Sequence, residues 1–555
     1  MKKIIIYSTL LVLVFASSCQ KDFLDRVPLD TIVDETFWET EEHLVLAANT
    51  AYAYVKAKNA VDIDQMGDNS INSTASNAYR VISSGNFTYD LATVNNQWKD
   101  QYSGIRDCNN FLANYNRAES VSVERREALA GEVRVVRALL YFYLTFFFGD
   151  VPIVDKPLAI DEVYGPRDPQ EKVIDFIIAD LDEAAQHLPP GIPTGANLGR
   201  ISRGAALALK ARVALFAGRY AMAEKAAQDV IDLGVYSLYS NGNPQTSYNE
   251  LFTWEGKLAG GKNRETILAR AYLSDVAMHN LSREIQVPDQ SSRFNPTKAL
   301  VDSYLDINGL PINHPNSVYR EDTYQDIFRN RDPRMTQTIL APGAKWGGRK
   351  DGNPSNTDLT TFTAPRFTSG NPGGTVTLTG FYFTKYVHIP TVAQVSRDQN
   401  DIHLIRYAEV LLTLAEAKLE LGTLTQADVD RTINVIRDRV GMVHMNLAEL
   451  AANGLDVREE IRRERRVELV MEGLRWFDIV RWKQGELLAA DVKGMRRSLA
   501  TVPADVANLR VDAAGYILVN DGRRFEAPKN YLLPVPMEQL NRNPALGQNP
   551  GWENQ

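Results

Sequence analysis

The rest of the chain is expected to be organised around one stretch, Glu459–Trp482, with the sequence EEIRRERRVELVMEGLRWFDIVRW. Apolar residues recur in it at helical spacing and predict one buried face: Val467, Val470, Met471, Leu474 and Phe477. A second apolar row consists of Leu469, Gly473, Trp476 and Val480. So wide an apolar stripe predicts one helix that is packed on two sides.

The same stretch carries dense charges of both signs. Glu464, Glu468 and Glu472 lie four residues apart, in one row along the predicted helix. The arginines beside them are Arg462, Arg463, Arg465, Arg466 and Arg475, and the spacing predicts the pairs Glu459→Arg463 and Arg465→Glu468. Glycosidases use two carboxylates around the scissile bond, but a general acid needs a raised pKa, and neighbouring arginines lower it. We therefore interpret the row as a structural Arg–Glu network that ties this helix to its neighbours.

The first residues have the pattern of an exported lipoprotein. Lys2 and Lys3 precede the apolar run Ile4–Phe15, which is too short to span a bilayer and has the length of a signal sequence. Ala16-Ser17-Ser18-Cys19 then resembles a lipobox, which predicts cleavage before Cys19 and lipidation of its thiol. The other cysteine, Cys108, lies on a helical pattern with Ile105 and Leu112, and we expect it to be a buried, inert thiol.

The sequence offers little sign of catalysis, of a metal site or of nucleic-acid binding. The net charge of −8 argues against a nucleic-acid partner. The hydrolase motifs G-x-S-x-G and H-E-x-x-H are absent, and no histidines stand at metal-ligand spacing. Asp62, Asp64 and Gly67 match a calcium-binding loop only loosely. We therefore expect no enzyme activity, no cofactor and no metal.

Helical patterns with small residues at facing positions occur twice. The segments Ser202–Leu233 and Ala408–Val440 each read as two helices around a glycine turn, which resembles a tetratricopeptide unit. Further helices are predicted over Thr36–Lys56, Glu124–Phe148 and Pro169–Leu188, and Trp98, Tyr102, Ile105 and Asn109 share one helix face. Stacked units of this kind usually bind partners.

Between the two repeat units, Tyr236–Asp401 has few helical patterns. Gly and Pro are frequent within Ala341–Gly380, which predicts loops that carry variable binding surface. Thr375–Thr379 alternates like a short strand, and Phe381–Phe383 continues the pattern. The sequence therefore predicts a mainly α fold, in which tetratricopeptide-like repeats support a loop-rich face with few short strands.

Several motifs, taken in order, resemble the SusD/RagB family of surface lipoproteins of Bacteroidetes. The resemblance rests on the lipobox at Cys19 and the charged residues 20–25, on the face Trp98–Asn109, and on Arg137-Ala138, Tyr141-Phe142 and Gly149-Asp150-Val151-Pro152. It continues through Arg406–Leu412, Ala415-Glu416-Ala417, Arg462–Trp482, Leu533-Pro534-Val535-Pro536, Asn543-Pro544 and Gln548–Trp552. These segments span nearly the whole chain, and Tyr236–Asp401 matches least.

The resemblance implies a division of the chain and a task. It implies a signal peptide over 1–18, an N-terminal repeat region over 19–235, a variable ligand-binding region over 236–400 and a C-terminal region over 401–555 that completes the scaffold. It implies a lipid-anchored protein exposed at the outer membrane. Such a protein captures oligosaccharides or polysaccharides and passes them to a SusC-like TonB-dependent transporter as its lid. A lid for peptides and a surface glycoside hydrolase remain as alternatives.

Sugar binding favours aromatic rings beside polar donors and acceptors on loops. The candidates from the N-terminal loop region are Asp68, Asn69, Tyr79 and Arg80, and those from the middle are Tyr272, Trp346 and Arg349. Trp346 stands in Lys345-Trp346-Gly347-Gly348-Arg349, where little nearby sequence would bury the indole, so we expect it to be a platform for a sugar ring. Trp98, by contrast, is expected to pack in the core.

Overall fold

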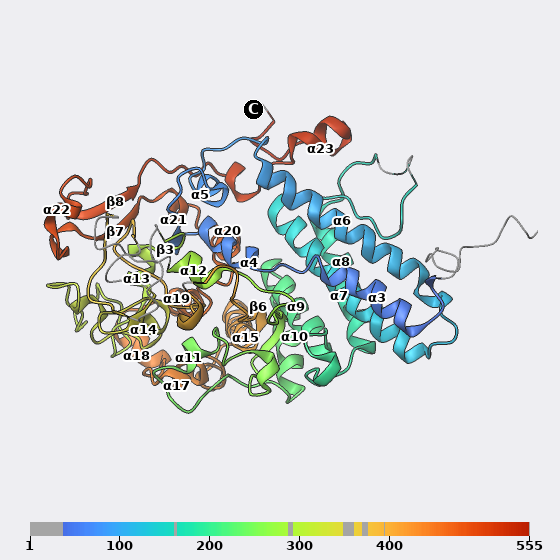
Figure 1. The fold of residues 1–555 in the computed structure, drawn as a ribbon, viewed down its shortest axis with the longest axis horizontal. Coiled ribbons are helices and arrows are strands. Elements are labelled where there is room, and N and C mark those ends of the chain that lie inside the picture. The colour runs from blue at the N-terminus through green and yellow to red at the C-terminus, as the bar shows by residue number, and fades with distance from the viewer. Residues whose placement is uncertain are drawn as a thin grey trace, which may run out of the picture.

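The computed structural model describes residues 37–159, 162, 164–286, 292–347, 360–368, 376–392 and 394–553. Cys19, the signal sequence and Arg349 lie outside these ranges. Figure 1 shows a bundle of long helices at one end and short helices, loops and hairpins at the other, with α15, α19 and α20 between them. None of the described helices is long and apolar enough to cross a bilayer.

The N-terminal half is built from long antiparallel helices. They are α3 (Glu41–Tyr52), α6 (Ala92–Asn114), α7 (Val123–Phe148), α8 (Gln170–His187), α9 (Arg203–Phe216) and α10 (Tyr220–Asp232). Short elements connect them: α4 (Asn59–Asp62), η2 (Ile63–Met66), α5 (Ala78–Ser83), η3 (Tyr115–Arg117) and η5 (Gly195–Asn197). The Trp98 face of α6 packs inward as predicted, and both Trp98 and Cys108 are buried in the core. Burial raises the pKa of the Cys108 thiol, which agrees with an inert residue.

The middle of the chain carries only short helices. They are α11 (Ser247–Glu250), η6 (Leu258–Gly260), α12 (Leu281–Ile285), α13 (Lys298–Ser303), η7 (Asp326–Phe328), α14 (Arg334–Thr338) and η8 (Ile389–Thr391). The strand predicted over 375–379 and 381–383 was wrong for the described residues. Among those of 376–383, only Val376 and Phe383 sit in single β-bridges, because Gly380 turns the backbone with a φ of +87°.

Four small antiparallel pairs of strands tie distant parts of the described chain together. β1 (Ser70–Ile71) pairs with β3 (Asn295–Pro296), β2 (Thr266–Arg270) with β6 (Ile402–Arg406), β4 (Lys345–Trp346) with β5 (Thr360–Thr361), and β7 (Val492–Arg496) with β8 (Tyr516–Asn520). The β2–β6 pair joins the loop-rich middle to the start of the second repeat unit.

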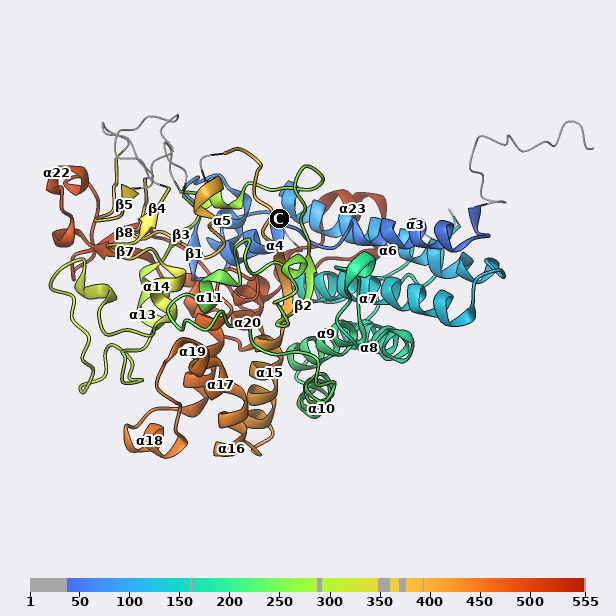
Figure 2. The same ribbon diagram turned by 60° about the horizontal axis from the view of Figure 1, so that its bottom comes forward.

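The C-terminal part completes the helical scaffold. It contains α15 (Tyr407–Glu420), α16 (Gln426–Val429), η9 (Asp430–Asn434), α17 (Val435–Val440), α18 (Leu447–Ala452), α19 (Val457–Glu468), α20 (Arg475–Arg481), α21 (Glu486–Ala489), η10 (Arg497–Leu499), α22 (Pro503–Val506), η11 (Lys529–Tyr531), α23 (Met537–Arg542) and η12 (Pro544–Leu546). In Figure 2, α15 and α16 lie beside α9 and α10, so the two predicted repeat units stack although about 200 residues separate them. A buried ion pair of 2.6 Å between Arg212 on α9 and Glu409 on α15 joins the units.

The stretch Glu459–Trp482 forms two helices, so the expectation of one continuous helix was wrong. The backbone leaves the helical region between α19 and α20, where Met471 and Gly473 have φ angles of +62° and +74°. A Cβ atom on Gly473 would lie 2.2 Å from the carbonyl oxygen of Ala60, so only glycine permits this contact. Both apolar rows are nevertheless inward-facing, and the stretch packs on two sides as expected.

Three glutamates of this stretch, Glu464, Glu468 and Glu472, belong to one buried cluster of charges. The cluster pairs the cations Arg334, Arg406, Arg437, Arg439 and Lys385 with the carboxylates of Asp332, Glu265, Glu464, Glu468 and Glu472. Its formal charges therefore cancel. Glu468 lies at its centre and accepts hydrogen bonds from Arg406 at 2.7 Å and Arg439 at 2.6 Å. We call it the central ion cluster.

The central ion cluster confirms the structural interpretation of the glutamate row and corrects its partners. Arg465 pairs with Asp478 at 2.9 Å instead of Glu468, and Glu459 pairs with Arg462 instead of Arg463. The cluster's cations come from α14, β6, α17 and the loop at Lys385, because those elements converge on α19. The network thus connects the loop-rich middle to both the helix pair and the second repeat unit.

Replacing Glu468 by glutamine should destabilise the fold strongly. The change leaves buried arginines without their charge partner, a defect that typically costs about 3–5 kcal/mol. The midpoint of thermal unfolding of Glu468→Gln should therefore fall well below that of the wild type. The control Glu459→Gln removes a carboxylate whose side chain is 53% exposed, so it should change the midpoint of thermal unfolding little. Equal midpoints for both variants would contradict the structural role of Glu468.

The same residue predicts how stability depends on pH. Burial alone would raise the pKa of Glu468, but Arg439, Arg406 and Arg334 outweigh burial and hold the pKa well below its usual range. Its folded pKa is thus below the unfolded value of roughly 4.3. The stabilisation is complete above that value and is lost as the pH falls towards the folded pKa. Unfolding scans between about pH 6 and 3 should show a steeper loss for the wild type than for Glu468→Gln; parallel curves would contradict this origin.

Candidate ligand-binding site

A polar cavity of about 330 Å³ lies where α4, α5, α12 and the start of β3 meet. Its lining combines one accessible aromatic ring with hydroxyl, amide and charged groups: Lys58, Asp62, Asn72, Thr74, Ser76, Asn77, Tyr79, Glu284, Arg293 and Phe294. We call it the Tyr79 pocket. Segments that are far apart in the sequence contribute to it, so it exists only in the folded chain.

The short helix α5 positions the aromatic ring. Asn77 precedes the helix, and its side-chain oxygen accepts hydrogen bonds from the backbone N–H groups of Tyr79 at 3.1 Å and Arg80 at 3.3 Å. The side chain of Gln97 hydrogen-bonds the Tyr79 hydroxyl, while burial raises the pKa of this phenol. One end of the Tyr79 side chain is thus fixed, and the half-buried ring lines the cavity.

The loop 72–77 supplies polar groups around this ring. Arg80 donates hydrogen bonds to the carbonyl oxygens of Asn72 and Ser73 at 2.8 and 3.3 Å and so holds the loop against α5. Within the described chain, the side-chain hydroxyls of Thr74 and Ser76 have no hydrogen-bond partner, and both residues are exposed. These hydroxyls are therefore free to bind a polar ligand.

Charged residues of both signs also line the pocket. The ammonium group of Lys58 lies 3.1 Å from Asp62 and 2.7 Å from Glu284, and Arg293 lies 3.6 Å from Glu284. Burial would lower the pKa of Lys58, but the two carboxylates outweigh it and raise this pKa. Burial raises the pKa of Asp62, with Lys58 acting against this effect. Lys58 is thus charged and held between two carboxylates.

The predicted site residues Asp68 and Asn69 lie behind the pocket and do not line it. Arg475 donates to Asp68 at 2.7 Å, and Arg466 donates to Asn69 at 2.8 Å. Burial would raise the pKa of Asp68, but Arg466 and Arg475 hold it well below its usual range. Both residues are buried, so their contacts connect the N-terminal loop to α19 and α20.

Two aromatic candidates are also buried, contrary to the expectation that they would be exposed. The Trp346 side chain is only 6% exposed, because Phe362 and Tyr382 pack against the indole with ring centres 5.2 and 5.3 Å away. Tyr272 is 9% exposed and packs against His279. Its hydroxyl faces the backbone N–H of Lys58 and so supports the edge of the Tyr79 pocket.

Among the predicted ligand-binding residues that the structure describes, Tyr79 alone lines the pocket. Most of the other lining residues were not predicted from the sequence. The run Asn72–Asn77, with its clustered amides and hydroxyls, was a signal that could have been used. Asp62 was considered as a calcium ligand, but Asn59–Met66 is helical and Asp62 pairs with Lys58, so no calcium loop forms there. Glu284 and Arg293 carried no local signal, because contacts between distant segments bring them to the loop, among them the β1–β3 pairing and the Lys58–Glu284 ion pair.

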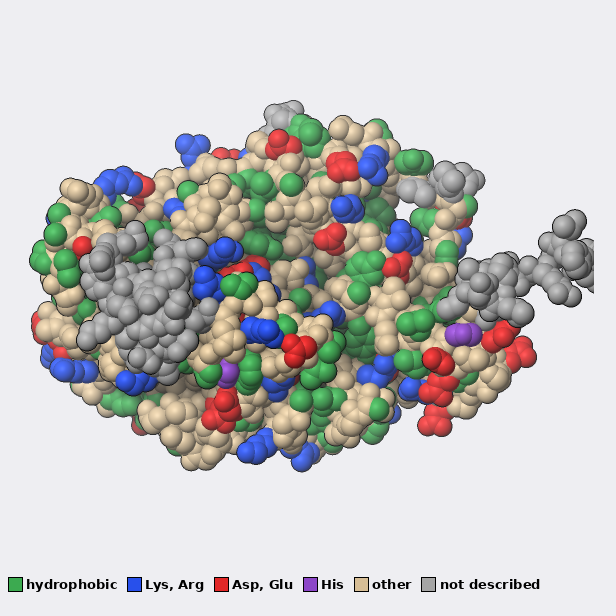
Figure 3. Space-filling view, viewed as in Figure 1, with side chains coloured by type: hydrophobic (Ala, Val, Ile, Leu, Met, Phe, Trp, Pro, Cys, Tyr) green, Lys and Arg blue, Asp and Glu red, His purple; other side chains and the backbone are tan. Residues whose placement is uncertain are grey.

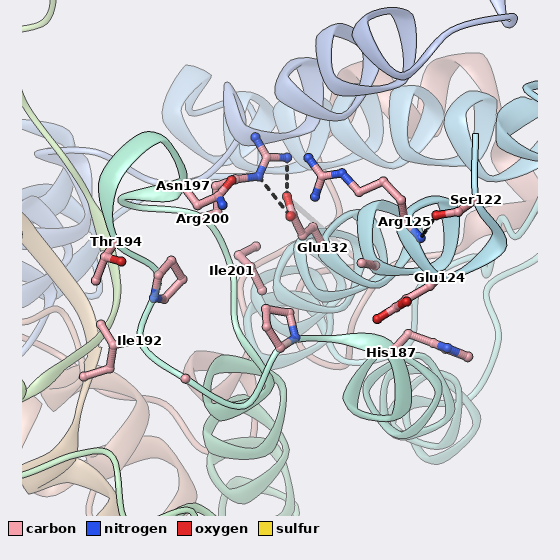
Figure 4. A pocket seen from close by; sticks show the side chains of 14 residues that line it. Ser122, Glu124, Arg125, Glu132, His187, Ile192, Thr194, Asn197, Arg200 and Ile201 are labelled. Carbon is pink, nitrogen blue, oxygen red and sulfur yellow. Dashed lines mark hydrogen bonds and ion pairs between the residues drawn. The ribbon is translucent and has the colours of Figure 1, made fainter. Parts of the chain in front are cut away.

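A larger cavity of about 470 Å³ lies between the start of α7, the end of α8 and the loop that precedes α9 (Figure 4). Arg200 and Glu132 form an ion pair of 2.5 Å on its wall, and prolines and isoleucines cover much of the rest. No Phe, Tyr or Trp side chain of the described residues lines it. It therefore lacks the ring on which a sugar can stack.

One group of side chains near that cavity has spacing suited to a metal ion, although the sequence had shown none. Possible ligand atoms of Glu127, Glu183 and His187 lie within 4.8 Å of one another. These side chains are half-exposed, and Arg134 lies 3.7 Å from Glu127. Exposed acidic groups of this kind are common without a metal, so the group carries no metal assignment.

The structure is a helical-repeat scaffold with a polar pocket on its loop-rich side, and comparisons with known proteins identify its family. A family model described as the SusD family matches residues 265–552. A second model, described as starch-binding and associating with the outer membrane, matches residues 22–215. The chain belongs to the SusD family.

Relatives and solved structures match nearly the whole chain. SusD-like protein P25 from Formosa agariphila is 24% identical over 96% of both chains. A SusD-like carbohydrate-binding protein from Bacteroides fragilis is 28% identical and superposes with a TM-score of 0.77 over 92% of this chain and all of its own. A laminarin-binding SusD-like protein shares the fold, with 21% identity and a TM-score of 0.62 over 93% of this chain and all of its own.

Replacing Trp346 by alanine should affect stability more than ligand binding. The change removes a buried indole between Phe362 and Tyr382, and such cavities typically cost about 3–5 kcal/mol. Thermal unfolding should show a clearly lower midpoint for Trp346→Ala. The control Tyr164→Ala removes an aromatic ring that is 63% exposed and should unfold close to the wild type. A normally stable Trp346→Ala protein that no longer bound glycans would restore the indole as a sugar platform.

Proposed function

We propose that this protein captures oligosaccharides at the outer surface of the cell and passes them to a SusC-like TonB-dependent transporter, over which it acts as a lid. A lipid on Cys19 holds it to the outer membrane, and the captured sugar leaves chemically unchanged. The Tyr79 pocket is the proposed site of capture.

The observation that carries this proposal is the composition of the Tyr79 pocket. The half-buried ring of Tyr79 lines the pocket and suits a pyranose ring, whose C–H groups pack on aromatic faces. The free hydroxyls of Thr74 and Ser76 and the carboxylates of Asp62 and Glu284 can bind several sugar hydroxyls at once. The carbohydrate-binding relative from Bacteroides fragilis, at 28% identity, supports the same class of ligand.

The charged groups also support binding without catalysis. Glu464, Glu468 and Glu472 are buried in ion pairs, and the pKa values of Glu468 and Glu472 are lowered, whereas a general acid needs a raised one. In the Tyr79 pocket, burial raises the pKa of Asp62, but the ammonium of Lys58 lies between the carboxylates of Asp62 and Glu284 and acts against this effect. If the protein hydrolysed a polysaccharide and a single carboxylate substitution abolished this activity, the proposal would be contradicted.

A peptide-binding lid of the same architecture is the main rival. The larger cavity of Figure 4, with its prolines and isoleucines beside charged groups, is the feature that favours it. Calorimetry with a panel of oligosaccharides and short peptides distinguishes the two. Binding of peptides alone would favour the rival function.

Replacing Tyr79 by alanine should weaken oligosaccharide binding. The loss of the stacking ring should lower the affinity for the best glycan by roughly tenfold, which corresponds to about 1.4 kcal/mol. Isothermal titration calorimetry measures this change, with unfolding scans to show that the variant is folded. The control Tyr164→Ala removes a tyrosine that is 63% exposed and lies outside the pocket. Unchanged affinity in a folded Tyr79→Ala protein would refute the site.

Replacing Cys19 by alanine should release the protein from the membrane, because lipidation requires the thiol. Cell fractionation with an antibody against the protein measures the distribution, and Cys108→Ala serves as a control that keeps the proposed anchor. If Cys19→Ala protein stayed in the membrane fraction as the wild type does, the proposed lipid anchor would be wrong.

A further inference from the structure

The charges of the Tyr79 pocket compensate one another, and this balance bears on the kind of glycan that it accepts. Its charged lining residues are Lys58, Asp62, Glu284 and Arg293, two cations and two carboxylates. Lys58 bridges Asp62 and Glu284 at 3.1 and 2.7 Å, and Arg293 lies 3.6 Å from Glu284. Among the described lining residues, no cation is left without a carboxylate beside it.

We infer that the Tyr79 pocket selects uncharged oligosaccharides over glycans that carry carboxylate or sulfate groups. This inference rests on the proposed function and specifies its class of ligand. It concerns the residues that determine specificity, namely Asp62 and Glu284 together with Lys58.

An anionic ligand would enter this pocket at an electrostatic cost. The ammonium group of Lys58 has three N–H donors, and Asp62 and Glu284 already accept from two of them, so a ligand carboxylate at the third would lie beside both carboxylates. Like charges at such separations repel each other. Glu284 has only 12% of its side chain exposed and Asp62 has 17%, so water screens them less than it screens a surface pair.

Neutral sugars find hydrogen-bond partners in the same pocket. An ionised carboxylate only accepts hydrogen bonds, and two adjacent sugar hydroxyls can both donate to it. Asp62 and Glu284 provide such acceptors, while the hydroxyls of Thr74 and Ser76 can both donate and accept. A neutral sugar therefore meets complementary partners without changing the charge balance.

Arg80 adds one further cation beside the pocket, and its Nη1 group already donates to the backbone carbonyl oxygens of Asn72 and Ser73. Acidic and basic side chains are intermixed over the face shown in Figure 3. The net charge of the chain is −8, which also disfavours the approach of polyanions.

Affinity electrophoresis and calorimetry test the inference on the full-length protein without its signal sequence. The neutral probes are laminarin, soluble starch and galactomannan, and the anionic probes are polygalacturonate, alginate and chondroitin sulfate. Binding to at least one neutral probe, with anionic probes bound at least about tenfold more weakly, is expected. Comparable or tighter binding of an anionic probe overturns the inference and leaves glycan capture intact. Binding to none of the six probes contradicts the proposed function and the inference together.

Removing one carboxylate should change the specificity in a defined direction. Glu284→Gln leaves the pocket with two cations and one carboxylate, so it should bind the anionic probes about fivefold more tightly than the wild type. This gain should disappear in about 0.5 M NaCl, because salt screens the added attraction. Asp62→Asn should act in the same direction and provides a second variant if Glu284→Gln folds poorly.

Glu171→Gln is the matched control, since it removes a charge at a side chain that is 72% exposed and outside the pocket. It should leave the preference unchanged. If neither pocket variant gains affinity for any anionic probe, or if the control gains as much, the charge balance of the pocket does not determine specificity and the inference is wrong.

Discussion

The architecture depends on one physical constraint, which is that buried charges must be compensated. Glu468 is completely buried, and it is held there by Arg334, Arg406 and Arg439, which arrive from α14, β6 and α17. A carboxylate in this position would be prohibitively costly without those partners. The elements that carry the partners must therefore meet at α19, and this requirement fixes the loop-rich middle against the helical repeats.

Compensation of buried charges also fixes the N-terminal loops. Arg466 and Arg475, from the stretch that contains Glu468, hold Asp68 and Asn69. β1 follows directly after these residues, and its pairing with β3 brings Arg293 towards the loop 72–77. The Tyr79 pocket thus rests on the central scaffold without sharing its charges. The residues of the central ion cluster maintain the fold. Different residues, those of the Tyr79 pocket, are proposed to bind the ligand.

How much of this the sequence predicts depends on the range of the interactions. Helical periodicity and glycine turns located the long helices and the two repeat units, because those signals are local. The apolar rows of Glu459–Trp482 predicted its burial, but not the interruption at Gly473, which depends on the approach of Ala60 from a distant loop. The expected exposure of Trp346 was wrong for the same reason, since Phe362 and Tyr382 bury its side chain from other loops. Of the pocket residues, Tyr79 could be found by its type and its polar neighbours, whereas Glu284 and Arg293 could not.

The most direct test of the account is a crystal structure of the protein with a bound neutral oligosaccharide of about six sugar units. The account predicts a sugar ring stacked on Tyr79, with hydroxyls bonded to Thr74 or Ser76 and to Asp62 or Glu284, and with the central ion cluster unchanged. Ligand density in the larger cavity between α7 and α8, or against a displaced Trp346, with the Tyr79 pocket empty, would contradict it.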